Sequence, residues 1–249
     1  MYLKVPNLPQ NRVTTVIVDY RISKESENTL KNKGINVLKT AKLNNLYQAV
    51  NGHPDMQIHH LGGNLFVCEN TLYDYYKNLL PDAIIVSGCC LSSEYPYDIA
   101  FNAARVGDFC FHNLKYTDSQ ILEYYKRKGV KLINVKQGYS KCSVCLINEN
   151  SIITSDIKIA EKASKIGIDT LYFDSNEIIL KNLNHGFVGG IGGLIDKNVL
   201  AINGNIANLN NHRGLLKFCQ NKGVKIQSLS DSIPEDIGSI IPIKEARML

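Results

Sequence analysis

Two short segments of the sequence contain residue types that can do covalent chemistry. The first is His53-Pro54-Asp55, which places an imidazole two residues from a carboxylate. The second is Cys142-Ser143-Val144-Cys145, which offers a thiol as a nucleophile. A thiolate attacks electron-poor carbon, a histidine moves protons at the reacting atoms, and a carboxylate can bind a cation. A serine nucleophile is not indicated, because the sequence contains no Gly-x-Ser-x-Gly segment.

The Cys142-x-x-Cys145 spacing is also found in zinc sites and thiol redox pairs, but its context argues against both. We expect residues 143–147 to form a strand, and residues three apart on a strand point to opposite faces. The sequence has no second Cys-x-x-Cys pair, and Cys89 and Cys90 are adjacent rather than spaced as ligands. Seven cysteines, an odd number, indicate reduced thiols rather than a disulfide framework. We therefore expect no metal site.

Glycines gather at Gly189, Gly190, Gly192 and Gly193. This stretch lacks the third glycine of a dinucleotide-binding motif, and no helix is predicted directly after it. We expect these glycines to let backbones crowd together or approach a ligand.

A pattern of elements recurs along the chain and must position these residues. An apolar segment, a turn, a second apolar segment, a polar helical stretch and a final apolar strand follow one another. The clearest copy spans 142–173, where Ser155 or Asp156 can cap the helix. Further copies are predicted at 55–87, 98–135 and 190–229. In three copies the helix ends at a glycine that tolerates the left-handed conformation: Gly129, Gly167 and Gly223.

The two ends of the chain each provide part of a fifth copy. The start has a strand at Val13–Val18, a helix near 24–33 and a strand at 35–38, but no first strand. The end, 237–243, reads as a strand with no helix after it. We expect the end of the chain to supply the strand that the start lacks.

The spacing of the copies predicts the architecture. Matching positions at the first strands are separated by 43, 44, 48 and 49 residues. This regularity favours one α/β domain over residues 1–249, a five-bladed propeller of ββαβ units with pseudo-fivefold symmetry, closed by pairing of the N- and C-terminal segments. An open three-layer α/β sheet is the alternative, because it also alternates strands and helices. The matching positions are Asp55, Asp98, Cys142, Gly190 and Ser239.

The composition is that of a globular protein. Hydrophobic residues make up 44% of the 249 residues and charged residues 20%. The start of the sequence does not read as a signal peptide, and no apolar run approaches the roughly 18 residues of a membrane span. We therefore expect a cytoplasmic protein without membrane association. The net charge of +5 is scattered, so a nucleic-acid partner is not indicated.

The five-unit plan resembles that of the pentein superfamily, the guanidine-modifying enzymes. This superfamily includes arginine deiminases, agmatine deiminases, dimethylarginine hydrolases and amidinotransferases. The local match is Gly52-His53-Pro54-Asp55-Met56-Gln57-Ile58, followed by Gly62-Gly63-Asn64-Leu65-Phe66-Val67, which is similar to the His-x-Asp segment of the family. The chain looks like a divergent bacterial branch, and the repeat plan covers nearly all of it.

The resemblance implies a catalytic site at the propeller axis. His53 would be the acid and base, and Asp55 would bind the substrate. Cys142, two units further on, would be the nucleophile, with Lys141 or a bound cation lowering its pKa. The family's cysteine normally lies near the C-terminus, so a nucleophile at Cys142 requires a rotated order of units. The other family carboxylates have no clean match, and the candidates are Asp98, Glu235 and Asp236.

Two functions from different classes follow. The first is a Cys-dependent hydrolase or amidinotransferase acting on a small guanidino or amidino compound, with no organic cofactor and no metal. The second is a non-catalytic pentein that binds a macromolecular partner, like the member that acts as a translation initiation factor. Convergence of His53, Asp55 and Cys142 at one pocket would favour the enzyme, whereas an axis plugged by apolar side chains would favour the binding factor. A homodimer is compatible with either.

Overall fold

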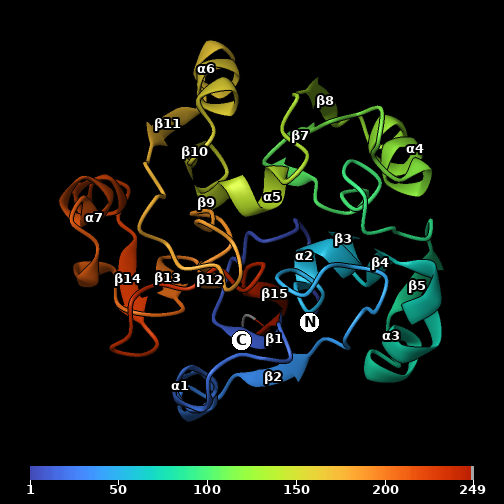
Figure 1. Ribbon diagram of the computed structural model, residues 1–249, viewed down its shortest axis with the longest axis horizontal. Coiled ribbons are helices and arrows are strands. Elements are labelled where there is room, and N and C mark those ends of the chain that lie inside the picture. The colour runs from blue at the N-terminus through green and yellow to red at the C-terminus, as the bar shows by residue number, and fades with distance from the viewer. Residues whose placement is uncertain (248–249) are drawn as a thin grey trace.

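The strands form five separate three-stranded sheets in the computed structural model, which describes residues 1–247. In each sheet the first strand runs antiparallel to the second, and the second runs parallel to the third. The sheets lie as blades around a common centre (Figure 1). The predicted five-bladed propeller is therefore confirmed, and the open-sheet alternative is wrong. From first to third strand, the blades are β15 (Ile241–Glu245), β1 (Val13–Val18) and β2 (Asn36–Lys39); β3 (Ile58–Gly62), β4 (Leu65–Cys68) and β5 (Ile84–Ser87); β6 (Ala104–Val106), β7 (Phe109–His112) and β8 (Lys131–Asn134); β9 (Val144–Asn148), β10 (Ser151–Thr154) and β11 (Asp169–Tyr172); β12 (Gly192–Asp196), β13 (Val199–Ile202) and β14 (Lys225–Ser228).

Each blade carries a helix between its second and third strands, and these helices lie at the periphery (Figure 1). The predicted cap Asp156 is confirmed, because its Oδ1 accepts the N–H of Ile159 at 2.8 Å. The three predicted glycine stops are confirmed as well, with φ between +69° and +85°. Within residues 1–247, no helix combines the length and apolar character that crossing a membrane requires. The peripheral helices are α1 (Lys24–Asn32), α3 (Tyr73–Leu79), α4 (Ser119–Arg127), α6 (Ile157–Lys165) and α7 (His212–Asn221), with short 3-10 turns η1 (Asn70–Leu72) and η2 (Ile206–Asn208) before α3 and α7.

The two ends of the chain close the ring, as predicted. Strand β15 pairs antiparallel with β1, so that Val16 faces Pro242 and Ile17 faces Ile241. The strand begins at Ile241, four residues later than predicted. The residues before it bend, because Ser239 has a left-handed φ of +80° that no strand residue adopts. This bend brings Ser239 and Asp236 to the centre of the molecule.

One-turn helices precede the first strands of two blades. They are α2 (Pro54–Gln57) and α5 (Ser140–Ser143), and both lie close to the centre (Figure 1). The predicted strand at 143–147 begins one residue later, at Val144, and the copy predicted at 55–87 opens with a helix, because in both the chain completes a helical turn first. In α2 the turn is favoured by Pro54, whose fixed φ suits the first helical position.

The correction at α5 changes the setting of the two cysteines. Cys142 lies on the helix, and Cys145 lies on β9, where it packs in the hydrophobic core. All seven cysteines are free. The two cysteines therefore lie on different elements, and the prediction that both lie on one strand is wrong.

Candidate active site

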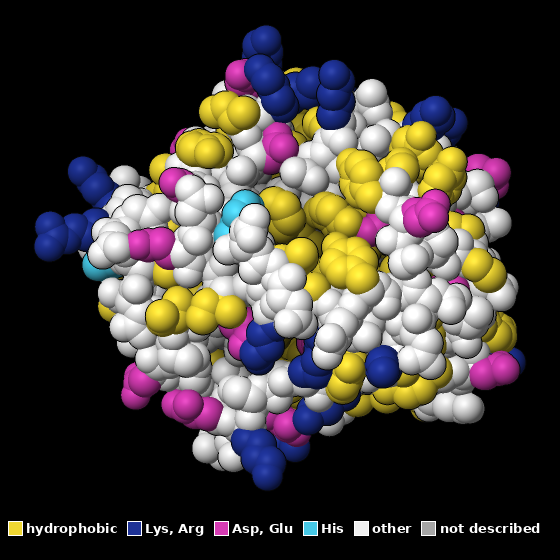
Figure 2. Space-filling model, viewed as in Figure 1, with side chains coloured by type: hydrophobic (Ala, Val, Ile, Leu, Met, Phe, Trp, Pro, Cys, Tyr) yellow, Lys and Arg dark blue, Asp and Glu magenta, His cyan; other side chains and the backbone are white. Residues whose placement is uncertain are grey.

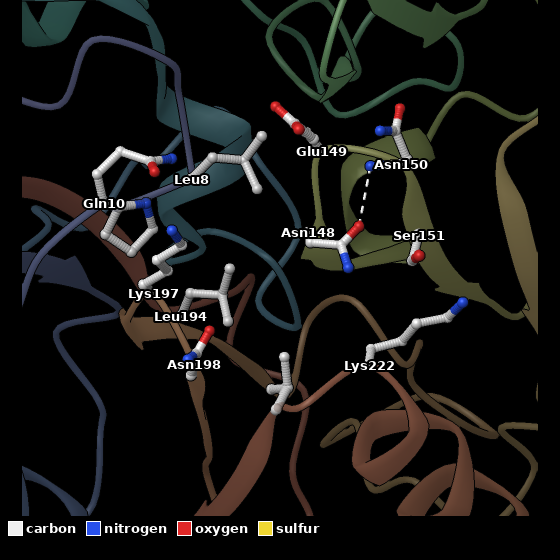
Figure 3. Close-up of a pocket in the computed structure, with 12 residues that line it drawn as sticks. Leu8, Gln10, Asn148, Glu149, Asn150, Ser151, Leu194, Lys197, Asn198 and Lys222 are labelled. Atoms are coloured by element: carbon white, nitrogen blue, oxygen red, sulfur yellow. Dashed lines mark hydrogen bonds between the residues drawn. The ribbon is translucent and has the colours of Figure 1, made fainter.

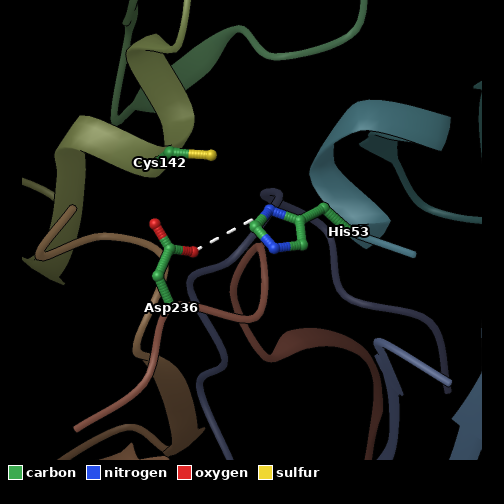
Figure 4. Close-up of side chains that lie close together, drawn as sticks. All are labelled: His53, Cys142 and Asp236. Atoms are coloured by element: carbon green, nitrogen blue, oxygen red, sulfur yellow. Dashed lines mark ion pairs between the residues drawn. The ribbon is translucent and has the colours of Figure 1, made fainter. Parts of the chain in front are cut away.

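Three side chains from three blades meet near the propeller axis. His53 is the N-cap of α2, Cys142 lies on α5, and Asp236 lies in the bend before β15. Their reactive atoms all lie within 4.8 Å of one another, and the side chains point toward a common space (Figure 4). Each residue is at most 3% exposed. The structure thus brings together the predicted acid/base and nucleophile, with a carboxylate beside them.

Cys142 is held as a thiol by its neighbours. Its Sγ donates a hydrogen bond to Asp55 Oδ2 at 3.1 Å and accepts one from Asn102 Nδ2 at 3.2 Å. Burial raises the pKa of Cys142 well above its usual value, and the charges of Asp55 and Asp236 raise it further. The expectation that Lys141 lowers this pKa is wrong for the protein without ligand. The ammonium of Lys141 lies instead on the Ser239 hydroxyl, at 2.7 Å.

Asp55 sits beneath the thiol. Its Oδ2 accepts the hydrogen bond from the Cys142 thiol, and the hydroxyl oxygen of Ser239 lies 3.1 Å from the same Oδ2. The other oxygen, Oδ1, is buried and has no hydrogen-bond partner among the described residues. Burial raises the pKa of Asp55 to about 6, although the nearby positive charge of Lys141 opposes the rise. This oxygen is unpaired, but Asp55 is not among the residues that line the pocket described below.

His53 has both ring nitrogens free. Within residues 1–247 neither Nδ1 nor Nε2 has a hydrogen-bond partner, and the nearest carboxylate oxygen, Asp236 Oδ1, lies 3.9 Å from Nδ1. Burial lowers the pKa of His53, and the charge of Asp236 opposes this only in part. The imidazole is thus neutral near pH 7 and able to accept a proton. Buried polar atoms without partners are rare in folded proteins, and at this pocket they indicate a place for ligand atoms.

Asp236 is fixed by backbone donors. Its Oδ2 accepts the N–H of Phe187 at 2.9 Å, and its Oδ1 accepts the N–H of Gly238 at 2.9 Å. A Cβ at Gly190 would lie 1.9 Å from Asp236 Oδ1, and a Cβ at Gly238 would lie 2.3 Å from the Cβ of His53. The expectation that the glycine-rich stretch lets backbones crowd together is confirmed at Gly189 and Gly193, where a Cβ would lie 2.4 Å and 1.9 Å from a backbone carbonyl oxygen.

Gly190→Ala should therefore cost activity through Asp236. The added methyl group has to push the carboxylate away from His53, so we expect at least a tenfold loss of thiol reactivity at Cys142. Gly214→Ala is the matched control, since a Cβ there meets no atom within 4 Å and the residue lies inside α7. Labelling rates and thermal unfolding of both variants would test this. Equal reactivity in both variants would show that the position of Asp236 is unimportant.

Asn102 is a member of the site that the sequence pattern missed. Its Oδ1 accepts the N–H groups of Lys141 and Cys142, at 2.8 and 3.2 Å, while its Nδ2 donates to the sulfur. It stands two residues before β6, as Cys142 stands two before β9 and Ser239 two before β15. Asn102, and not Asp98, therefore occupies the axis position of the third blade. Counting back from the correct strand start is the signal that would have found it.

The other two predicted carboxylates lie outside the cluster. Asp98 is buried behind the wall of the pocket, where its Oδ2 accepts the hydroxyl of Tyr139 at 2.5 Å. Burial raises the pKa of Asp98. Glu235 pairs with Lys181 at 2.7 Å and is partly exposed. The structure brings neither into contact with Cys142 or His53, and Asp236 takes the place beside His53.

A pocket of about 250 Å³ opens above the cluster. In the space-filling view, apolar side chains gather around a hollow near the centre of this face (Figure 2). The floor of the pocket contains the three reactive side chains, and most of its wall is aromatic or aliphatic. Its lining residues are Tyr47, Val50, His53, Tyr139, Cys142, Leu180, Leu183, Asn184, His185, Phe187 and Asp236.

A larger pocket, of about 430 Å³, lies elsewhere and offers less chemistry. It lies between the β9–β10 and β12–β13 turns and is lined mainly by polar side chains such as Asn148, Asn198 and Lys222 (Figure 3). Its lining residues include no cysteine, histidine or aspartate, and Glu149 is their one carboxylate. Its volume is larger, but the nucleophile, the base and the two unpartnered ring nitrogens of His53 lie at the smaller pocket.

The cluster could also be considered as a metal site. Imidazole, thiolate and carboxylate are ligands of zinc, and His53, Cys142 and Asp236 offer one atom each. A metal would have to displace the proton of the Cys142 thiol, which the sulfur directs at Asp55.

Comparison with solved structures defines the class of fold. Inosamine-phosphate amidinotransferase StrB1 from Streptomyces griseus matches with a TM-score of 0.60 at 10% identity, covering 100% of this chain and 99% of that one. SxtG, an amidinotransferase from Microseira wollei in the saxitoxin biosynthetic pathway, matches with a TM-score of 0.54 at 12% identity, covering 95% and 96%. DDAH from Pseudomonas aeruginosa, a mutant complexed with citrulline, gives 0.54 at 7% identity, covering 88% and 93%. The predicted resemblance to the pentein superfamily is confirmed, and at these identities it establishes the fold alone.

The family is defined by sequence. Residues 17–241 match the model of the family of unknown function DUF6873, and the chain belongs to that family. No curated protein matches the chain.

Proposed function

We propose that this protein is an enzyme that hydrolyses a guanidino or amidino compound, or transfers its amidino group, by covalent catalysis at Cys142. One observation carries the proposal: a thiol, an imidazole and a carboxylate from three blades converge, buried, at the floor of one pocket, and a second carboxylate, that of Asp55, lies 3.1 Å from the thiol. Free buried atoms, the two nitrogens of His53 and Oδ1 of Asp55, face no protein partner within the described residues. These groups match what a planar cation with several N–H donors requires.

Binding of the cation would activate the thiol. A guanidinium placed between Asp55 and Asp236 supplies the positive charge that both buried carboxylates lack, and so stabilises their ionised forms. The same charge offsets the two carboxylates that raise the pKa of Cys142. The thiolate then forms only with substrate present, and its proton passes to His53. This arrangement keeps the resting sulfur unreactive.

The chemistry balances with these groups alone. Cys142 gives its proton to His53, and its sulfur bonds to the guanidino carbon. The carbon–nitrogen bond to the leaving amine breaks as His53 returns that proton to the nitrogen, which leaves an amidino group on the sulfur. In hydrolysis, water gives a proton to His53 while its oxygen bonds to the carbon, and the carbon–sulfur bond breaks as the thiol is reprotonated. In transfer, the nitrogen of an acceptor amine replaces the oxygen of water.

Labelling of the thiol tests the proposal. Chloroacetamidine resembles a guanidinium and alkylates activated cysteine, and peptide mapping identifies the modified residue. We expect selective labelling of Cys142 at neutral pH, lost in Cys142→Ser, strongly slowed in His53→Ala and slowed by guanidino competitors. The labelling rate is also measured with added zinc and with a chelator, which separates metal binding from thiol activation. Labelling no faster than that of free cysteine, spread over the seven thiols, would overturn the proposal and favour a non-catalytic binding protein.

The pH dependence should follow Asp55. Its pKa is raised to about 6, so the carboxylate takes up a proton and loses its charge as the pH falls through that value. We expect the labelling rate and kcat/KM, which report on the free enzyme, to decline below about pH 6. The decline in kcat should lie at lower pH, because the bound cation stabilises the charged carboxylate. Asp55→Asn should lower kcat/KM and remove its decline below about pH 6. If the decline persists in this variant, another group is responsible for it.

A further inference from the structure

The upper part of the pocket is mainly apolar. Above the reactive floor, six of the eight remaining lining residues are aromatic or aliphatic, and the other two are Asn184 and His185. They come from the loop before α2, the residue before α5, and the long connection between β11 and β12. The space-filling view shows this apolar rim around the hollow (Figure 2). The residues concerned are Tyr47, Val50, Tyr139, Leu180, Leu183 and Phe187.

The tyrosine hydroxyls of this wall are already engaged. Tyr139 donates its hydroxyl proton to Asp98 at 2.5 Å, and its oxygen lies 3.1 Å from the hydroxyl of Tyr47. Because the Tyr139 proton is used on Asp98, the proton between the two tyrosines comes from Tyr47. Neither hydroxyl proton is then left for a ligand, so buried Asp98 makes this side of the wall behave as an apolar surface.

The lysine and arginine side chains near the pocket contact other protein groups. None of the eleven lining residues is a lysine or arginine. Lys181 pairs with Glu235 at 2.7 Å, Arg21 pairs with Asp19 at 2.6 Å, and Lys141 lies on Ser239. The carboxylate that lines the pocket is that of Asp236, and the carboxylate of Asp55 lies 3.1 Å from the Cys142 thiol. A carboxylate on the ligand would lose its hydration here and gain no partner.

We propose that the substrate carries its guanidino or amidino group on an uncharged apolar body and has no carboxylate, an inference that rests on the proposed function. The side chains at the floor of the pocket bind the cationic group of the substrate, and the apolar wall favours an apolar body because binding buries its surface. Amino-acid substrates with a free carboxylate are excluded by the missing counter-charge.

Two compounds of equal reach test the inference by their protection of Cys142 against chloroacetamidine. These are n-pentylguanidine and 5-guanidinopentanoate, which differ at the far end only. We expect pentylguanidine to protect at a concentration at least tenfold lower. Equal or better protection by guanidinopentanoate, or no protection by either compound while another guanidino competitor slows the labelling of Cys142, would overturn the inference and leave the proposed function standing. If Cys142 is not selectively labelled without competitor, the proposed function fails, and this inference fails with it.

Variants at the rim sharpen the test. Leu183 lines the pocket and is 48% exposed, so Leu183→Arg adds a cation at the rim without burying it. We expect guanidinopentanoate to protect at least tenfold better in this variant, with pentylguanidine changed less than about threefold. Ile179→Arg is the matched control, since Ile179 lies on the same connection, is 41% exposed and does not line the pocket. Tight guanidinopentanoate binding that is lost in His185→Gln would assign carboxylate recognition to His185 and overturn the inference.

Discussion

Cys142→Ala should lower turnover of an alkylguanidine by about 10⁴-fold or more, because the sulfur is the atom that bonds to the guanidino carbon. Asp55 and His53 remain in place in this variant, but neither can replace the missing thiol. The measurement is release of urea and the alkylamine, with hydroxylamine added in a parallel assay so that amidino transfer is detected as hydroxyguanidine. Substrate binding should persist, since the carboxylates that recognise the cation are unchanged.

Cys145→Ala provides the matched control for this prediction. Cys145 lies three residues further on in the same blade, is equally buried, and has its pKa raised to about 11 by burial. Its side chain packs in the core and does not line the pocket. We expect turnover within about threefold of wild type and a stability loss of roughly 1 kcal/mol for the lost buried sulfur. Similar losses of turnover in the two variants would mean that Cys142 acts through packing and not as a nucleophile.

The fold could be predicted because each blade repeats a local physical pattern. Apolar strands, capped helices and glycine stops such as Gly167 act within a few residues of each other, so they can be read from the sequence. Closure followed from counting: Val13–Val18 lacked a first strand, and the chain ended in one. The one-turn helices α2 and α5 escaped because four residues give no period to recognise.

The site could be predicted only in part, because side-chain direction at the axis is set by irregular chain. His53, Asp55 and Cys142 were found from a short motif and from the spacing of blades, and the structure places them together. The spacing of the blades predicts Asp98 as the corresponding residue of the third blade. The position two residues before β6 is instead Asn102. The irregular segment before β6 hid this offset of four residues.

The bend before β15 shows the same limit. Glu235 and Asp236 are neighbours and chemically similar, so composition cannot distinguish them. The backbone N–H groups of Phe187 and Gly238 hold Asp236 against His53, whereas Glu235 turns outward to Lys181. Phe187 lies in the long connection between β11 and β12, and Gly238 has a left-handed φ. Neither segment has a periodic pattern that could be recognised in the sequence.

His53→Ala should lower turnover by about 10³-fold while leaving the fold intact, because it removes the group that accepts the thiol proton and returns it to the leaving amine. The raised pKa of Cys142 makes this loss large, since without a base the sulfur stays protonated even beside a bound cation. Turnover and the chloroacetamidine labelling rate should fall together. The variant should still bind pentylguanidine, because Asp55 and Asp236 remain.

Chemical rescue separates proton transfer from a structural role for His53. The ring is buried and has no hydrogen-bond partner among the described residues, so its removal leaves space that free imidazole can enter. Added imidazole should restore part of the turnover of His53→Ala, and the rescue should increase with pH as imidazole loses its proton. His185→Ala is the control, because His185 lines the same pocket but lies at its rim, and imidazole should have no effect on it. Wild-type turnover in His53→Ala would refute the acid and base role, and so would a loss that imidazole leaves unchanged at every pH.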